Sequence, residues 1–395
     1  MLKPTIISIL DKLIFSCLIL YSLTFLIDIP INFLILSSFF CIIKFIFLPP
    51  KISIQSKHLL FIFIFIFCTL FITILHPTAS LLEYKSRFIS PLSVLILLFA
   101  FKFTYKKSII LLSGFAFVLS INASIIIFQF FQGEHGRLIG LCQDHYMLLC
   151  GFNLLILPIL FTLALKKSKL NKIIRMFFFF TIIINIPAII FENTRIVWLT
   201  LGIIFPIIIF TSIKNKKHII LFLSIFILSV YTLFQISPSS LQRFETIFST
   251  DYKVQSNYER ILIWQSSINM FIDNPILGVG VGNFHNDYMN IYRSPLSRED
   301  NEHSHNNFLL FFSETGFLGG FSFILFLIYL YYYSIKKFFQ TKNIVHLCFI
   351  YFLLSFTMNC FTDCIFSART LKPLTYMFWF FITLYLSLIN SVKIK

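Results

Sequence analysis

Two histidines near the end of the longest polar stretch of the sequence are the first candidates for chemistry. His303 and His305 lie two residues apart in the string NEHSHNNF, and Asn306 follows directly. A neutral imidazole accepts a proton readily near neutral pH, so either residue could remove the proton of a hydroxyl group in a transfer reaction. Two histidines could also bind a metal ion, but the other ligands would have to come from scattered carboxylates. We therefore expect a general base here and no metal.

Three arginines in the same part of the chain are suited to holding an anion. Arg195 ends the string ENTR between two apolar runs, and Arg243 and Arg260 lie in the polar stretch. A guanidinium group keeps its charge and presents a fixed fork of donors that matches phosphate oxygens. A charge beside a membrane span is costly unless it pairs, so Arg195 either pairs with Glu192 or binds a ligand. Arg243 and Arg260 are either ordinary surface residues or part of the same diphosphate site.

Glycines cluster on both sides of the histidines. Gly278, Gly280 and Gly282 lie in PILGVGVGNF, and Gly316 follows Glu314 in the string SETG. The spacing G-x-G-x-G differs from the dinucleotide-binding fingerprint, and no predicted strand precedes it. Because glycine adopts backbone conformations that other residues avoid, this segment is either a turn that returns the chain to the membrane or a place of close approach to a ligand.

The composition indicates that a lipid bilayer surrounds most of the chain. Hydrophobic residues make up 58% of the 395 positions, 12% are charged, and 54 residues are Phe. No soluble fold could bury this much apolar surface. The eight cysteines contain no zinc-like C-x-x-C pair, and we expect them to behave as small apolar side chains.

The apolar runs predict an all-α polytopic membrane protein with about 12 transmembrane helices, since about 20 apolar residues are needed to cross the hydrocarbon core. The expected spans are 13–27, 31–49, 58–76, 88–101, 108–131, 146–165, 176–191, 196–212, 219–236, 307–334, 343–361 and 374–391. They divide the chain into a nine-helix membrane region at 1–236, a long loop at 237–306 and a three-helix membrane region at 307–395.

The distribution of charge predicts which side of the membrane each loop faces. Most of the 32 Lys and Arg fall at one set of span ends, whereas nearly all of the 16 Asp and Glu fall at the other. Because short cytoplasmic loops retain Lys and Arg, both termini should be cytoplasmic and the long loop should face the periplasm of a bacterial inner membrane. Contact with anionic membrane lipids accounts for the net charge of +16, and we expect no nucleic-acid partner.

The loop at 237–306 should contain short helices and the catalytic residues, because structureless loops of this length are uncommon unless they are functional. The strings SSLQRFETIF and NYERILIWQSSINMFIDNP have apolar residues at helical spacing. Ile261, Trp264, Ile268 and Phe271 fall on one stripe of the second string. We expect two helices that lie across the outer mouth of the bundle.

These pieces, in their order along the chain, resemble the O-antigen ligase family, whose shared module also occurs in O-antigen polymerases. The matching pieces are Thr194-Arg195, Arg260 with Trp264, Pro275 to Phe284, Ser304-His305-Asn306 with Leu309, and Glu314 through Gly319. They cover roughly residues 190–330. The expected twelve spans are similar to the number in the family.

The resemblance implies a metal-independent membrane glycosyltransferase that needs no cofactor. Such an enzyme moves a glycan from an undecaprenyl diphosphate donor to a sugar hydroxyl of the lipid A-core. The resemblance places the base at His305 and the donor diphosphate at Arg195 and Arg260. Candidate supporting residues are Arg243, His303, Asn306 and Glu314.

Two other functions compete with an O-antigen ligase. An O-antigen polymerase, which joins lipid-linked repeat units, shares the same motifs. A twelve-span transporter would be expected to have internal repeats and ionisable residues near the membrane midplane, and the apolar runs of this chain are nearly free of charge. The ligase is therefore the preferred prediction, the polymerase is the main alternative, and the transporter comes third.

Overall fold

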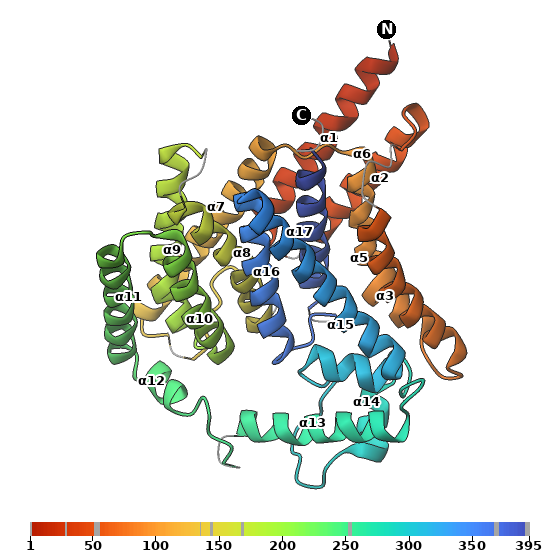
Figure 1. Cartoon of the computed structure of the whole chain (residues 1–395). Coiled ribbons are helices and arrows are strands. Elements are labelled where there is room, and N and C mark those ends of the chain that lie inside the picture. Colours follow the sequence, from red (N-terminus) through yellow and green to blue (C-terminus); the bar gives the residue numbers. More distant parts are fainter. Residues whose placement is uncertain are drawn as a thin grey trace.

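Within the described part of this computed structural model, every regular element is a helix (Figure 1). The structure describes residues 2–27, 30–50, 56–134, 136–142, 145–166, 170–251, 255–366 and 371–391. Ten described helices are long and apolar enough to cross a membrane, which confirms an all-helical, multi-pass membrane protein. They are α1 (Leu2–Thr24), α2 (Pro30–Phe47), α3 (Ser56–Leu75), α7 (Tyr105–Phe131), α8 (Tyr146–Leu165), α9 (Lys172–Phe191), α10 (Arg195–Ser212), α11 (Lys216–Ile236), α15 (Asn307–Thr341) and α17 (Lys372–Ser391).

Two of the twelve predicted spans differ from these ten helices. The segment predicted to span at 88–101 is broken, and its pieces are α4 (Leu81–Tyr84), η1 (Lys85–Ile89), α5 (Ser90–Leu92), η2 (Ser93–Ile96) and α6 (Leu97–Ala100). Pro91 lies in α5 and explains the break, because it has no amide hydrogen and its ring clashes with the carbonyl four residues earlier. That carbonyl belongs to η1, which is a π-helical turn. The predicted span 343–361 is α16 (Ile344–Cys360), an apolar helix of only 17 residues.

Helix α8 forms the centre of the bundle. Its residues from Met147 to Ala164 are all buried, and it packs against α9, α10 and α16. A helix that is apolar all round is expected to lie inside such a bundle. By contrast, Phe234 is the only buried residue among the described residues of α11. This helix lies at the periphery of the bundle, where its apolar side chains can contact lipid (Figure 1).

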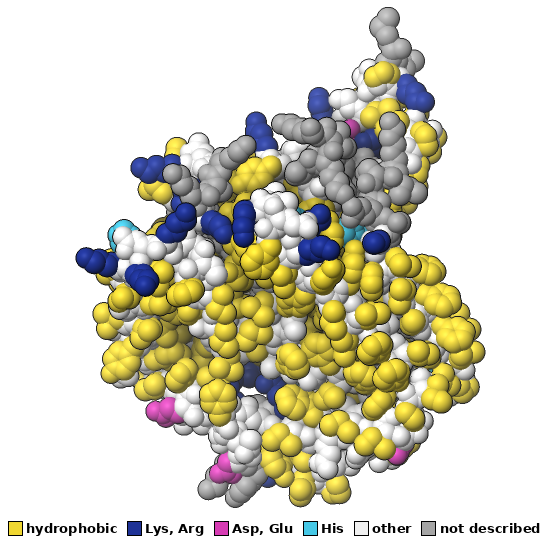
Figure 2. Space-filling model, viewed as in Figure 1, with side chains coloured by type: hydrophobic (Ala, Val, Ile, Leu, Met, Phe, Trp, Pro, Cys, Tyr) yellow, Lys and Arg dark blue, Asp and Glu magenta, His cyan; other side chains and the backbone are white. Residues whose placement is uncertain are grey.

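The two ends of the bundle differ in charge. The chain termini lie at one end, whereas α12 (Pro238–Glu245), α13 (Gln255–Asp273) and α14 (Phe284–Asp287) lie at the other (Figure 1). Lys and Arg side chains gather at the end with the termini, and Asp and Glu side chains appear at the opposite end (Figure 2). A broad band of hydrophobic side chains separates them, as expected for a protein surrounded by a bilayer.

Helix α13 buries a different face from the predicted stripe. Ile261 and Ile268 are exposed, whereas Leu262, Ile263 and Met270 are buried. The buried face packs against a small apolar cluster formed by the segments that follow it, including η3 (Tyr288–Tyr292). The helical spacing predicted the helix itself, but it does not show which of two partly apolar faces packs against the segments that follow.

The glycine-rich segment is a structural turn that fits against a kink in α15. Gly316 interrupts α15 with φ 62° and ψ −161°, a conformation that side chains with a Cβ rarely adopt. The amide of Val279 donates to the carbonyl of Ser313 at 2.8 Å, and the amide of Gly280 donates to the carbonyl of Glu314 at 3.0 Å. The amides of the turn therefore donate hydrogen bonds to the carbonyl groups at the kink. This arrangement favours a structural turn over a place of close approach to a ligand.

Alanine at Gly278 or Gly316 should destabilise the protein by about 1–3 kcal/mol or more, because both residues have positive φ. A Cβ at Gly278 would collide with the backbone of Glu314, and one at Gly316 would collide with the backbone of Ile276. Thermal unfolding of the purified protein in detergent measures the change. Gly202 is the matched control, since it has no positive φ and a Cβ there would meet nothing within 4 Å. Equal melting temperatures for all three variants would contradict the proposed role of the turn.

Candidate active site

The predicted arginines and His305 come together in the wall of one cavity, although they are far apart in the sequence. Arg195 begins α10, Arg243 lies in the last turn of α12, and Arg260 lies in the first half of α13. We call this the arginine cavity; its volume is about 230 Å³. Its lining residues are Arg137, Tyr146, Met147, Thr194, Arg195, Ile196, Arg243, Ser256, Glu259, Arg260, Glu299, Asn301 and His305.

Arg195 holds the short helices of the loop against the bundle. Its Nε donates to the carbonyl of Arg243 at 3.0 Å, and its Nη1 donates to the side chains of Ser256 and Asn257 at 3.0 and 3.1 Å. The expected alternative, a pair with Glu192, is wrong, because the buried Glu192 carboxylate instead accepts from Cys150 and Asn153. All hydrogen-bond partners of Arg195 among the described residues are neutral, so its positive charge remains available to the cavity.

The other three arginines of the cavity have free donors. Arg137, Arg243 and Arg260 donate no hydrogen bond to any described residue, and the Arg243 Nε is buried without a partner. Burial, with Arg137 and Arg195 nearby, lowers the pKa of Arg243 to about 10, and burial also lowers the pKa of Arg260. Clustered cations that lack partners are unfavourable until an anion neutralises them. The cavity is therefore suited to a ligand with several negative oxygens.

Arg137 is the one arginine of the cavity that the sequence analysis did not single out. It lies between α7 and α8, and its guanidinium carbon is 3.7 Å from the centre of the Tyr146 ring. A cation over an aromatic face is stabilised without using the N–H groups at its edge, so these donors stay free for an anion. The signal that could have found Arg137 is its place in a short polar segment expected on the same side of the membrane as the long loop.

A second cavity of about 210 Å³ adjoins the first, and we call it the histidine cavity. Its lining residues are His145, Tyr146, Met147, Arg260, Asp300, Asn301, Glu302, His303, His305, Asp363 and Leu371. Arg260 and His305 line both cavities. A side chain at this boundary can contact one substrate in each cavity at the same time, as a group transfer requires.

His305 faces Asp363 in the histidine cavity. Its Nδ1 lies 3.8 Å from the Asp363 Oδ1, and the Asp363 side chain is almost fully buried. Burial raises the pKa of Asp363, but the nearby His305 and His303 imidazoles outweigh burial, so the net pKa lies below its usual value. The carboxylate therefore stays ionised and can stabilise an imidazolium that forms at His305. The sequence signal was that Asp363 is the only acidic residue after Glu314.

The backbone at His305 adopts an uncommon conformation. His305 has φ 49°, an uncommon value for a residue with a Cβ, and its amide donates to the His303 Nδ1 at 3.3 Å. Asn306 caps α15, since its side-chain oxygen accepts from the amides of Phe308 and Leu309. That oxygen is therefore used to cap the helix. Residues in such strained conformations cluster at functional sites.

His303 lies in an environment that disfavours its protonated form. Burial, with His305 nearby, lowers the pKa of His303 to about 4. His303 is therefore neutral at physiological pH and resists protonation. This property makes His303 a poor acceptor for a proton released by a substrate, and His305 stays the predicted base.

Glu314, a candidate supporting residue, lies in neither cavity. Its Oε2 pairs with the Arg87 Nη1 at 2.7 Å, and its Oε1 accepts from the amide of Gly282 at 3.1 Å. These contacts link α15 to the glycine-rich turn and to the broken helical segment that runs from α4 to α6. Glu314 therefore lies in the frame around the two cavities, and a supporting role for it stays a prediction.

His303, His305 and Asp363 also have a geometry that a metal ion could use. Their ligand atoms all lie within 4.8 Å of one another, so the third ligand that seemed to be missing from the sequence is supplied by Asp363. A zinc ion prefers four ligands at about 2.0–2.2 Å, so small side-chain rotations would be needed to bind it. The absence of a metal in the working enzyme remains a prediction.

A chelator should leave glycan transfer unchanged, whereas added zinc should inhibit it, because zinc would occupy the nitrogen that accepts the proton. Transfer by the purified protein in the presence of EDTA, and separately in micromolar zinc, measures both effects. Zinc should inhibit an Asp363→Asn variant less than the original chain, after each is normalised to its own activity. Loss of transfer in EDTA that zinc restores would instead establish a catalytic metal.

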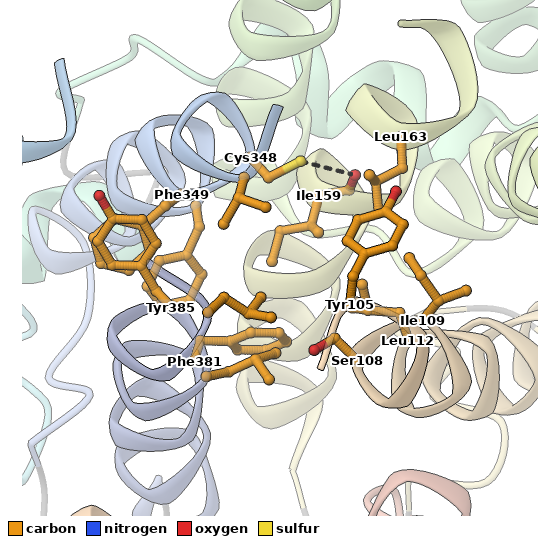
Figure 3. A pocket seen from close by; sticks show the side chains of 14 residues that line it. Tyr105, Ser108, Ile109, Leu112, Ile159, Leu163, Cys348, Phe349, Phe381 and Tyr385 are labelled. Carbon is orange, nitrogen blue, oxygen red and sulfur yellow. Dashed lines mark hydrogen bonds between the residues drawn. The ribbon is translucent and has the colours of Figure 1, made fainter. Parts of the chain in front are cut away.

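An apolar cavity between α7, α8, α16 and α17 is a separate feature (Figure 3). Tyr105, Leu163 and Cys348 line it, and they lie near the ends of their helices on the side of the chain termini, away from α13. Figure 3 shows mainly hydrocarbon side chains around it, and the Cys348 sulfur points to the carbonyl of Ile159. No charged residue lines this cavity, so it is not suited to bind a diphosphate.

The fold and the two cavities define a multi-pass membrane protein with a cationic, histidine-containing site at one end of its bundle. Residues 179–324 match the family model described as O-Antigen ligase. The match confirms the resemblance inferred from the motifs. It contains Arg195, Arg243, Arg260, His303 and His305, whereas Arg137, His145 and Asp363 lie outside it. The chain therefore carries the module shared by O-antigen ligases and polymerases. No curated protein matches the chain.

Proposed function

We propose that this protein is an O-antigen ligase, which transfers a glycan from undecaprenyl diphosphate to a sugar hydroxyl of the lipid A-core. The observation that carries the proposal is the arginine cavity, where three guanidinium groups without hydrogen-bond partners among the described residues surround a space that also touches His305. A diphosphate is the part of the donor that requires such a site. The domain match supports the same class of enzyme.

The transfer needs only groups that this chain supplies. His305 removes the proton of the acceptor hydroxyl, whose oxygen attacks the anomeric carbon of the donor sugar, while the bond from that carbon to the diphosphate oxygen breaks. The electron pair of this bond goes to the diphosphate, where Arg137, Arg243 and Arg260 offset the added charge. The proton remains on His305 beside the Asp363 carboxylate until solvent takes it.

The orientation of the protein in a bacterial inner membrane is part of the proposal. The distribution of Lys and Arg supports cytoplasmic termini and a periplasmic active site. A reporter that is active only outside the cytoplasm should be active when fused after Thr250 and inactive when fused after Lys216, and a cytoplasmic reporter should give the opposite pattern. The reverse result for both fusions would invert the side of the active site.

The lipopolysaccharide pattern of a deletion strain separates the ligase from the polymerase. Loss of a ligase should remove all glycan from the core while polymer accumulates on the lipid carrier. Loss of a polymerase should leave a core that carries one repeat unit. The single-repeat pattern would overturn the ligase assignment and leave the donor chemistry of the site unchanged, because both enzymes use a lipid diphosphate donor.

A further inference from the structure

The two cavities that meet at His305 differ in the sign of their charge. Four arginines and two glutamates, Glu259 and Glu299, line the arginine cavity. The Glu259 carboxylate is buried and accepts from the Ser297 hydroxyl at 2.7 Å and the Arg298 amide at 2.7 Å. The charge that this cavity presents to a ligand is therefore positive.

The histidine cavity has the opposite balance. Asp300, Glu302 and Asp363 supply three carboxylates, and Arg260 is its only lysine or arginine among the described residues. Asp300 and Glu302 are exposed at the mouth, whereas Asp363 is buried within. An anion entering this cavity would meet more negative than positive charge.

We infer that the histidine cavity is the acceptor subsite and that it selects an uncharged sugar over one that carries a carboxylate or phosphate next to the reacting hydroxyl. This inference rests on the proposed transfer to a sugar hydroxyl. His305 lies at the boundary, so it can reach a hydroxyl in the histidine cavity while the donor diphosphate fills the arginine cavity. The carboxylates keep anionic groups out of the acceptor position and leave the arginines for the donor.

The arginine cavity would thus bind the donor, and the histidine cavity would select the acceptor. A phosphorylated or acidic acceptor could otherwise bind the four arginines and compete with the donor. The repulsion acts partly through solvent, because the Asp300 side chain is exposed. The Asp300 Oδ1 also lies 3.3 Å from the His285 Nδ1. The repulsion should therefore weaken as salt concentration rises, whereas selection by shape alone would not.

The test uses the full-length protein in lipid nanodiscs with a short-chain prenyl diphosphate oligosaccharide as donor. Two acceptors share the same oligosaccharide and differ in the terminal sugar, which is a hexose in one and the corresponding hexuronate in the other. The hexose acceptor should have a kcat/KM about tenfold higher at low salt. Glu302→Lys and Asp300→Lys, made singly, should each reduce this ratio severalfold and leave the KM of the donor unchanged.

Glu245→Lys is the matched control, since Glu245 is an exposed carboxylate of the same loop that lines neither cavity, and it should leave the acceptor ratio unchanged. Equal efficiencies for the two acceptors, or a ratio that neither charge reversal alters, would overturn the inference and leave the proposed transfer intact. Transfer to neither acceptor would overturn the proposed function and the inference together.

Discussion

Replacing His305 with alanine should lower glycan transfer by about 10²–10⁴-fold, the usual contribution of a general base. The imidazole lies at the boundary of both cavities and beside the buried Asp363 carboxylate, so its removal takes away the proton acceptor and leaves the donor site in place. Single-turnover transfer by purified protein gives the rate. Retention of a labelled prenyl diphosphate by the variant shows that the donor still binds.

His303→Ala is the matched control for His305→Ala, because it removes a neighbouring imidazole whose ring centre is 4.5 Å away. It should reduce transfer less. Asp363→Asn should reduce transfer to an intermediate degree, since the imidazolium would lose its nearby carboxylate while the side-chain volume stays the same. Near-normal transfer by His305→Ala together with loss in His303→Ala would move the base to His303. Full activity in both would exclude a histidine base.

The sequence predicted the arginines and histidines of the site better than it predicted their partners. The motif order and charge type indicated Arg195, Arg260 and His305, and the structure brings all three to one cavity. Arg137 and Asp363 were missed because each lies in a separate short segment, where a single charged residue is common on a protein surface. Only packing shows that these segments lie beside the long loop.

The fold was predicted well wherever apolar length alone decides the structure. Helices such as α8 and α9 follow long apolar runs, since the bilayer requires each span to satisfy its own backbone hydrogen bonds. The predicted span at 88–101 is instead part of a broken segment at 81–100. Local features, including Pro91, interrupt a run that is apolar enough to cross the membrane. Glu314 was named as a supporting residue because it belongs to the motif that follows the histidines, and its partner Arg87, which lies on that broken segment, could not be predicted from the motif.

Alanine at Arg260 should lower transfer by about 10²–10³-fold, the cost of losing one well-placed donor to a developing negative charge. Arg260 lines both cavities and donates no hydrogen bond to any described residue, so its N–H groups are free to bind the diphosphate. Lysine should restore little activity, because a single ammonium group cannot make two parallel hydrogen bonds to phosphate oxygens. Transfer rate and retention of labelled donor are measured for each variant.

Arg195→Ala separates ligand binding from structure, because Arg195 differs from Arg260 in having protein partners. It should lose transfer and also lower the melting temperature, since its side chain holds α12 and α13 through Arg243, Ser256 and Asn257. Arg260→Ala should lose transfer with little change in melting temperature, or even a small increase, because removing one of several clustered cations relieves repulsion. Arg298→Ala, an exposed arginine of the same loop outside both cavities, is the control and should change neither quantity. Normal donor retention and transfer in Arg260→Ala would exclude this residue from the diphosphate site and leave Arg137 and Arg243 to hold the donor.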